Sequence, residues 1–153
     1  MPPLRALLEA GLLRDLAIRN AVNMPEAEIY AFTHTVFYGT NYGRDISLFA
    51  EIGRLASLRA DTLVLLDEMR TRGHWDLVAE LVLAWRNLGG GGRLSVDHAW
   101  QALSDTQRAD GSFPATDETS IQDEADPGRN RALRRYHVCL VAALAAFASC
   151  KQR

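Results

Sequence analysis

Residues 130–149 read NRALRRYHVCLVAALAAFAS and contain the longest apolar run of the chain. From Val138 to Ser149 this run leaves almost no polar face, which is typical of a helix buried on nearly every side. The sequence therefore predicts a buried last helix around which the other segments pack. His137 lies at the edge of the run and needs a hydrogen-bond partner, a metal or a ligand, because an unpaired buried polar group costs about 1–3 kcal/mol.

The chain has 153 residues, and we expect residues 1–153 to form a single helical domain with its own core. A hydrophobic fraction of 48% excludes a disordered chain. The net charge of -2 gives no electrostatic argument for binding nucleic acid. We therefore expect a partner that is neutral or apolar.

Cys139 and Cys150 fall on the same predicted helix, and their separation along it exceeds the reach of a disulfide. We therefore expect two thiols, as in a reducing cytoplasm. The last apolar run stops at Lys151, so no membrane span is predicted. Lys151 is also the single lysine among the 17 basic residues, a bias that indicates a GC-rich bacterial source.

Apolar residues recur every three or four positions through most of the chain, and no stretch alternates at period two for long enough to form a strand. The sequence therefore predicts an all-α fold with six or seven helices. The sequence is compatible both with two helices separated by Gly53 and with one long helix through it. The expected helices cover residues 3–19, 26–38, 46–55, 57 or 58 to 72, 74–88, 95–109 and 130–149.

Residues 111–128 carry acidic side chains and two prolines but almost no apolar ones. A structureless loop of this length is unusual inside a compact domain, so we expect it to be either disordered or a lid. Its composition favours a disordered, flexible loop.

Residues 33–43, THTVFYGTNYG, combine a histidine with several aromatic residues. His34 and Tyr38 are four positions apart and share one helix face, and Tyr30 lies one turn earlier on that face. One interpretation is an aromatic-lined pocket with a proton-transfer histidine, because aromatic walls bind apolar or cationic species. The alternative is a core helix whose histidine is held by a backbone carbonyl.

Asp76 and Glu80 are also four positions apart, so both carboxylates share a face of the fifth predicted helix. Paired carboxylates suit acid–base or metal chemistry. The alternative is a solvated helix face.

Two short segments resemble the α/α-toroid superfamily. Residues 106–113, TQRADGSF, are similar to the repeated Gln-x-x-Asp-Gly-Ser-Phe turn of these proteins, which include squalene and terpene cyclases and the β subunits of protein prenyltransferases. Residues 136–139, YHVC, resemble the Tyr-His-Thr-Cys element of the prenyltransferase subunits, in which the histidine is a zinc ligand. Because a complete toroid has about twice as many helices as this chain, the resemblance implies a toroid-like half-barrel, with a plain helical bundle as the alternative.

The same resemblance implies zinc at His137. The Asp-x-Cys segment that supplies further zinc ligands in prenyltransferases is absent from this sequence. We therefore expect no cofactor and no metal ligands, with zinc as the alternative.

We expect a bacterial cytoplasmic protein that binds or acts on an apolar small molecule, with a cyclase or rearrangement enzyme of specialised metabolism as the catalytic form. In that form two histidines transfer protons, a tyrosine orients them and a carboxylate is the acid. The expected catalytic residues are His34, His137, Tyr38, Asp76 and Glu80, and the expected substrate-binding residues are Tyr30, Phe37, Tyr42, Trp85 and Tyr136.

The alternative function is a non-catalytic helical interaction module. Half a toroid leaves apolar helix faces uncovered, and such faces favour a homodimer or a larger biosynthetic enzyme as partner. Neither function requires nucleic acid or a membrane.

Overall fold

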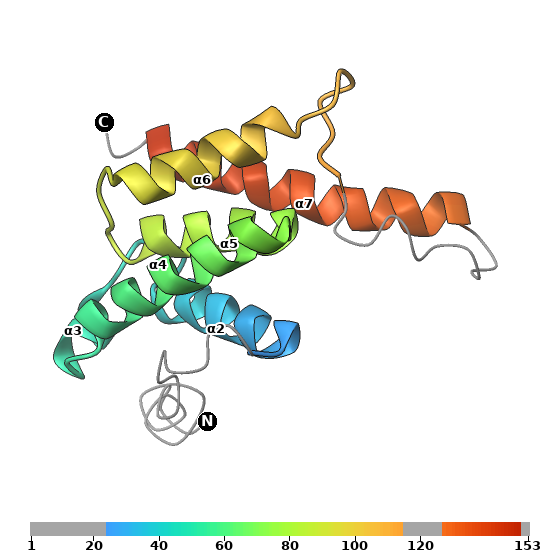
Figure 1. Cartoon of the computed structure of the whole chain (residues 1–153). Coiled ribbons are helices and arrows are strands. Elements are labelled where there is room, and N and C mark those ends of the chain that lie inside the picture. The colour runs from blue at the N-terminus through green and yellow to red at the C-terminus, as the bar shows by residue number, and fades with distance from the viewer. Residues whose placement is uncertain (1–23, 115–126, 151–153) are drawn as a thin grey trace.

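The computed structural model describes residues 24–114 and 127–150, and this part of the chain contains six helices and no strand (Figure 1). The predicted all-α class is therefore confirmed. The helix predicted at residues 3–19 and most of the acidic segment 111–128 lie outside the described residues. The helices are α2 (Glu26–Gly39), α3 (Ser47–Glu51), α4 (Leu55–Arg72), α5 (Trp75–Asn87), α6 (Leu94–Asp105) and α7 (Pro127–Cys150).

The central element is α5, because α2, α4, α6 and α7 all pack against it. Figure 1 shows α6 and α7 over one side of α5 and α2 over the other. From Asp76 to Trp85 every residue of α5 is buried. A helix that is buried all round needs neighbours on every side. The prediction that residues 130–149 are the stretch around which the fold is organised is therefore wrong.

The last helix, α7, buries only one face within the described structure. Val138, Val141, Ala142 and Ala145 form that face and pack into the core. The prediction of burial on nearly every side is wrong, because an apolar run does not determine how many neighbours a helix has. The other side carries an exposed α7 apolar stripe, made of Tyr136, Leu140, Leu144 and Phe147.

Two glycines separate consecutive helices. Gly53 has a φ of 67° and follows the end of α3, so the residues on either side of it belong to two helices. Gly73 has a φ of 68° and ends α4, as its position predicted. The predicted helix at 46–55 is shortened to α3, and Asp45 before it accepts a hydrogen bond from the Ser47 N–H at 2.8 Å.

The limits of α6 differ from the prediction at both ends. The helix begins at Leu94, after the extended residue Arg93, which is one residue before the predicted start at Ser95. It ends at Asp105, because residues 106–113 form a separate turn with its own hydrogen bonds. No helix in the described part of the chain has the length and apolarity needed to cross a membrane.

The turn at residues 106–113 uses the side chains that define its sequence pattern. Gln107 Nε2 donates to the Gly111 carbonyl at 2.9 Å, and Asp110 Oδ1 accepts from the Ser112 N–H at 2.9 Å. Phe113 then enters the core, where its N–H donates to Cys139 Sγ at 3.5 Å. The turn thereby joins the end of α6 to α7.

Candidate functional site

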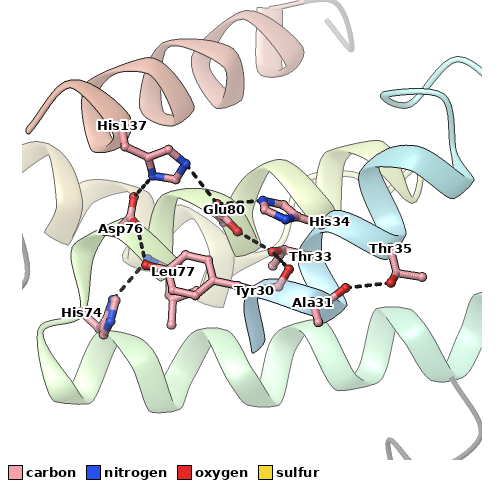
Figure 2. A network of polar contacts seen from close by, with 10 residues as sticks. All are labelled: Tyr30, Ala31, Thr33, His34, Thr35, His74, Asp76, Leu77, Glu80 and His137. Carbon is pink, nitrogen blue, oxygen red and sulfur yellow. Dashed lines mark hydrogen bonds and ion pairs between the residues drawn. The ribbon is translucent and has the colours of Figure 1, made fainter. Parts of the chain in front are cut away.

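Side chains from three helices meet in one polar cluster, which we call the site cluster (Figure 2). Helix α5 supplies two carboxylates from its buried surface, α2 supplies residues one helical turn apart, and α7 supplies a histidine. Four of the five predicted catalytic residues lie in this cluster. Its members are Tyr30, Thr33, His34, Asp76, Glu80 and His137.

Asp76 joins α2 to α7 through both of its carboxylate oxygens. Its Oδ1 lies 2.8 Å from His137 Nδ1, and its Oδ2 accepts a hydrogen bond from the Tyr30 hydroxyl at 2.5 Å. An ionised carboxylate only accepts hydrogen bonds, so this contact places the proton of His137 on Nδ1. The Nε2 atom of His137 is then the nitrogen left for chemistry.

Glu80 lies between the two histidines of the site cluster. Its side chain is 0% exposed, and its Oε2 accepts a hydrogen bond from the Thr33 hydroxyl. Its Oε1 lies 3.6 Å from His34 Nε2 and 3.6 Å from His137 Nε2, which is beyond hydrogen-bond distance, and it has no hydrogen-bond partner. Glu80 therefore keeps one unsatisfied carboxylate oxygen facing both imidazoles.

Burial favours the uncharged form of both Glu80 and Tyr30. It raises the pKa of the Glu80 carboxyl above its ordinary value, because the charged form loses its hydration, although the hydrogen bond from Thr33 and the two imidazoles act the other way. Burial and the bond to Asp76 raise the pKa of the Tyr30 hydroxyl far above its usual range. Tyr30 therefore remains a protonated donor to Asp76.

The two histidines are the accessible members of the site cluster. The side chains of His34 and His137 are 47% and 45% exposed, whereas that of Asp76 is 12% exposed. Imidazoles at the surface are thus backed by carboxylates in the interior. This arrangement suits proton exchange with a bound molecule.

His74 closes the site cluster on the side of Tyr30. It caps the start of α5, as the prediction of a helix-start residue implied, by accepting a hydrogen bond from the Leu77 N–H at 3.4 Å. Its Nε2 lies 3.3 Å from Glu26 Oε2, and its ring meets that of Tyr30 edge-on. His74 and Thr33 are not among the predicted site residues, although Thr33 lies in the aromatic segment 33–43. Thr33 is three residues from Tyr30 on α2, but only the packing of α2 on α5 brings it to Glu80.

A run of aromatic rings, which we call the ring run, leads from the site cluster along α2 to the following turn. The ring centroids of His34 lie 5.9 Å from Phe37 and 6.2 Å from Tyr38. The ring of Tyr42 stacks on Phe37 at 6.2 Å and stands nearly at right angles to Tyr38 at 6.0 Å. Tyr38, predicted to orient the histidines, therefore contacts His34 and not His137.

Two predicted substrate-binding residues lie elsewhere. Trp85 is buried near the end of α5, where its Nε1 donates to the Gly91 carbonyl at 2.9 Å and holds the glycine loop formed by residues 89–92. Tyr136 belongs to the α7 apolar stripe and is exposed. Both were predicted from their residue type, which does not show the direction of a side chain.

The donors around His137 do not fit the zinc ion that the family resemblance implies. Its Nδ1 is bonded to Asp76, and Cys139 Sγ accepts a hydrogen bond from Phe113. Among the residues with described positions, no group of three or more His, Cys, Asp or Glu side chains is arranged to hold a metal ion. Both Cys139 and Cys150 are free thiols.

Comparison with known proteins gives one match. A family model described as "Domain of unknown function (DUF6895)" matches residues 1–147. This span includes every residue of the site cluster and of the ring run. No curated protein and no solved structure matches the chain.

Proposed function

The chain belongs to the DUF6895 family, and we propose that it is an enzyme that transfers protons on an apolar small molecule, with His137 and His34 as its acid–base pair. The observation that supports this most is the bond between His137 Nδ1 and Asp76 beside the unsatisfied oxygen of Glu80. A histidine with one nitrogen held by a buried carboxylate presents its other nitrogen as a base.

In the proposed reaction His137 Nε2 takes a proton from a carbon of the substrate, and His34 donates a proton to the atom that gains the electron pair. Half-exposed imidazoles on two different helices allow both to contact one molecule. Glu80 Oε1 lies 3.6 Å from both Nε2 atoms. Its burial-raised pKa suits it to take up and release the proton that returns the pair to its starting state.

The substrate we propose is uncharged and largely apolar. A charged amine would need an exposed carboxylate beside the two imidazoles, but the side chains of Glu80 and Asp76 are 0% and 12% exposed, and the exposed Glu26 carboxylate lies against His74 instead. The ring run instead offers aromatic surface directly beside His34. Cyclisations and rearrangements of such molecules require a proton to be added at one atom and removed at another.

The toroid-like half-barrel remains part of the proposal. What supports it is the turn at residues 106–113, where the Gln, Asp, Gly, Ser and Phe of the pattern make the turn and anchor it in the core. The resemblance, the arginine bias and the two thiols together favour a biosynthetic enzyme of specialised metabolism in the bacterial cytoplasm. We propose that it works without a metal cofactor.

The base-catalysed ring opening of 5-nitrobenzisoxazole tests this proposal. In this reaction a base removes one C–H proton, the N–O bond breaks, and the oxygen leaves as a coloured phenolate. We expect the wild-type protein to exceed the rate of equimolar free imidazole, because a positioned base contributes about 10²–10⁴-fold. We expect His137→Gln to lose this excess and His34→Gln to reduce it.

The matched control is His98→Gln, which changes an exposed histidine of α6 outside the site cluster. Its rate should equal that of the wild type. A wild-type rate no higher than that of free imidazole would overturn the proposal, as would equal losses in the His98 and His137 variants.

One observation favours the interaction module as a second function. The α7 apolar stripe exposes four large side chains on consecutive turns, with exposed fractions from 41% to 65%. A second copy of the chain is the partner we propose, because an isologous contact would cover both stripes at once. Sedimentation should then show a dimer for the wild type and a monomer for Leu140→Glu with unchanged circular dichroism. A monomeric wild type at high concentration would contradict this second function.

A further inference from the structure

The turn after α2 holds a tyrosine in an unfavourable backbone conformation. Asn41, Tyr42 and Gly43 have consecutive φ angles of 48°, 54° and 77°. Glycine adopts these angles freely, but a bulky L-residue such as tyrosine rarely does. Backbone strain of this kind persists only where the surrounding structure enforces it, and it gathers at binding sites.

The surroundings of Tyr42 enforce this conformation. Its N–H donates to the Phe37 carbonyl at 2.8 Å, and the Asp45 N–H donates to the Thr40 carbonyl at 2.9 Å, which closes the turn on both sides. At Gly43 an added Cβ would lie 2.8 Å from the Asn87 side-chain oxygen, so this turn lies directly against the end of α5. The position of Tyr42 is therefore determined by the core.

The result of this strain is a corner of two exposed aromatic rings. Tyr42 lies over Phe37 with an interplanar angle of 19° and meets Tyr38 at 87°. Phe37 is buried, but Tyr38 and Tyr42 are 62% and 54% exposed. A ring that served only the core would be covered. These two rings present perpendicular surfaces to solvent, and Tyr38 lies one helical turn from His34.

We propose that Tyr38 and Tyr42 bind a planar, uncharged aromatic ring of the substrate and place its reacting group beside His34. Two perpendicular walls accept such a ring by stacking on one and meeting the other edge-on, both of which are favoured aromatic geometries. This inference rests on the proposed function, because His34 belongs to the proposed acid–base pair. It adds the class of substrate and the reason for the strained turn.

Binding of 2-naphthol, an uncharged planar ring, tests the inference independently of catalysis. We expect the wild type to bind it, and Tyr38→Leu and Tyr42→Gly each to weaken the binding about tenfold, within the range of a lost aromatic contact. Tyr42→Gly should unfold at the same or a higher temperature than the wild type, because glycine relieves the strained φ. An unchanged or raised unfolding temperature would show that the loss of 2-naphthol binding is not caused by loss of the fold.

Controls separate this inference from the proposed function. Tyr136→Leu removes a similarly exposed tyrosine of α7 and should leave 2-naphthol binding unchanged, and His98→Gln on α6 should also bind normally. Wild-type affinity in Tyr42→Gly, or no binding to the wild type, would overturn the inference. Preferential binding of the cation trimethylphenylammonium would also overturn it. Normal 2-naphthol binding without ring opening of 5-nitrobenzisoxazole would overturn the proposed function alone.

Discussion

Replacing Glu80 by glutamine should stabilise the protein at neutral pH. The substitution keeps the shape of the side chain and removes its charge. In the wild type Oε1 of Glu80 is buried without a hydrogen-bond partner. The Nε2 atoms of His34 and His137 each lie 3.6 Å from it. The glutamine oxygen can still accept from Thr33, and its amide can donate toward an imidazole.

The size of the gain follows from the cost of an unsatisfied buried group. Such a group costs about 1–3 kcal/mol, and more when it is charged. For a chain of this length, each kcal/mol shifts the unfolding midpoint by about 2–4 °C. We therefore expect Glu80→Gln to melt several degrees above the wild type at neutral pH.

The gain should also depend on pH in a defined direction. The folded-state pKa of Glu80 is raised above the ordinary value of 4.5. Its contribution to stability is therefore fully present below that ordinary value and is lost as pH rises through the folded-state pKa. Glutamine does not titrate, so the difference between variant and wild type should be smallest in acid and should grow toward neutral pH.

Thermal unfolding followed by circular dichroism at several pH values between 4 and 8 measures this difference. Glu51→Gln makes the same chemical change at an exposed position of α3 and should shift the midpoint little at any pH. A loss of stability in Glu80→Gln at neutral pH would refute the reasoning, because it would show that the Glu80 charge stabilises the fold. A gain of stability is what we expect if Glu80 is retained for function, because such residues commonly cost stability.

Three further predictions test the site cluster and the packing. Tyr30→Phe should lower stability by about 1–3 kcal/mol in thermal unfolding, because it leaves Asp76 Oδ2 without its buried donor. Asp76→Asn should reduce ring opening of 5-nitrobenzisoxazole by about 10²-fold or more, since the amide no longer fixes the proton of His137 on Nδ1. Leu81→Ala in the centre of α5 should lower the free energy of unfolding by about 2–5 kcal/mol in denaturant, whereas Leu140→Ala on α7 should lower it by less than about 1 kcal/mol. Equal losses would contradict the central place of α5.

The helix class and most turns could be predicted from the sequence because they depend on local patterns. The end of α4 at Gly73 follows from a left-handed backbone conformation that favours glycine, and the start of α5 at His74 follows from its side-chain cap. Which helix lies at the centre of the fold could not be predicted in this way. Asp76 and Glu80 make α5 look partly solvated, but partners from α2 and α7 allow both to be buried.

The site could be predicted only as pairs within single helices. His34 and Tyr38, like Asp76 and Glu80, are one turn apart, and that spacing is visible in any helical sequence. The contact between His137 and Asp76 joins residues 61 positions apart, so it depends on how α7 packs on α5. Residue type alone selected Trp85, which the structure places in the core near the glycine loop.

The central claim is that Asp76 holds His137 with its proton on Nδ1 and leaves Nε2 as the base. Nitrogen-15 NMR of histidine-labelled protein, at a pH where the imidazole is neutral, measures this directly. We predict that His137 carries its proton on Nδ1 in the wild type and moves toward the Nε2–H form in Asp76→Asn. A wild-type His137 in the Nε2–H form would contradict the claim, because the nitrogen assigned as base would then carry the proton.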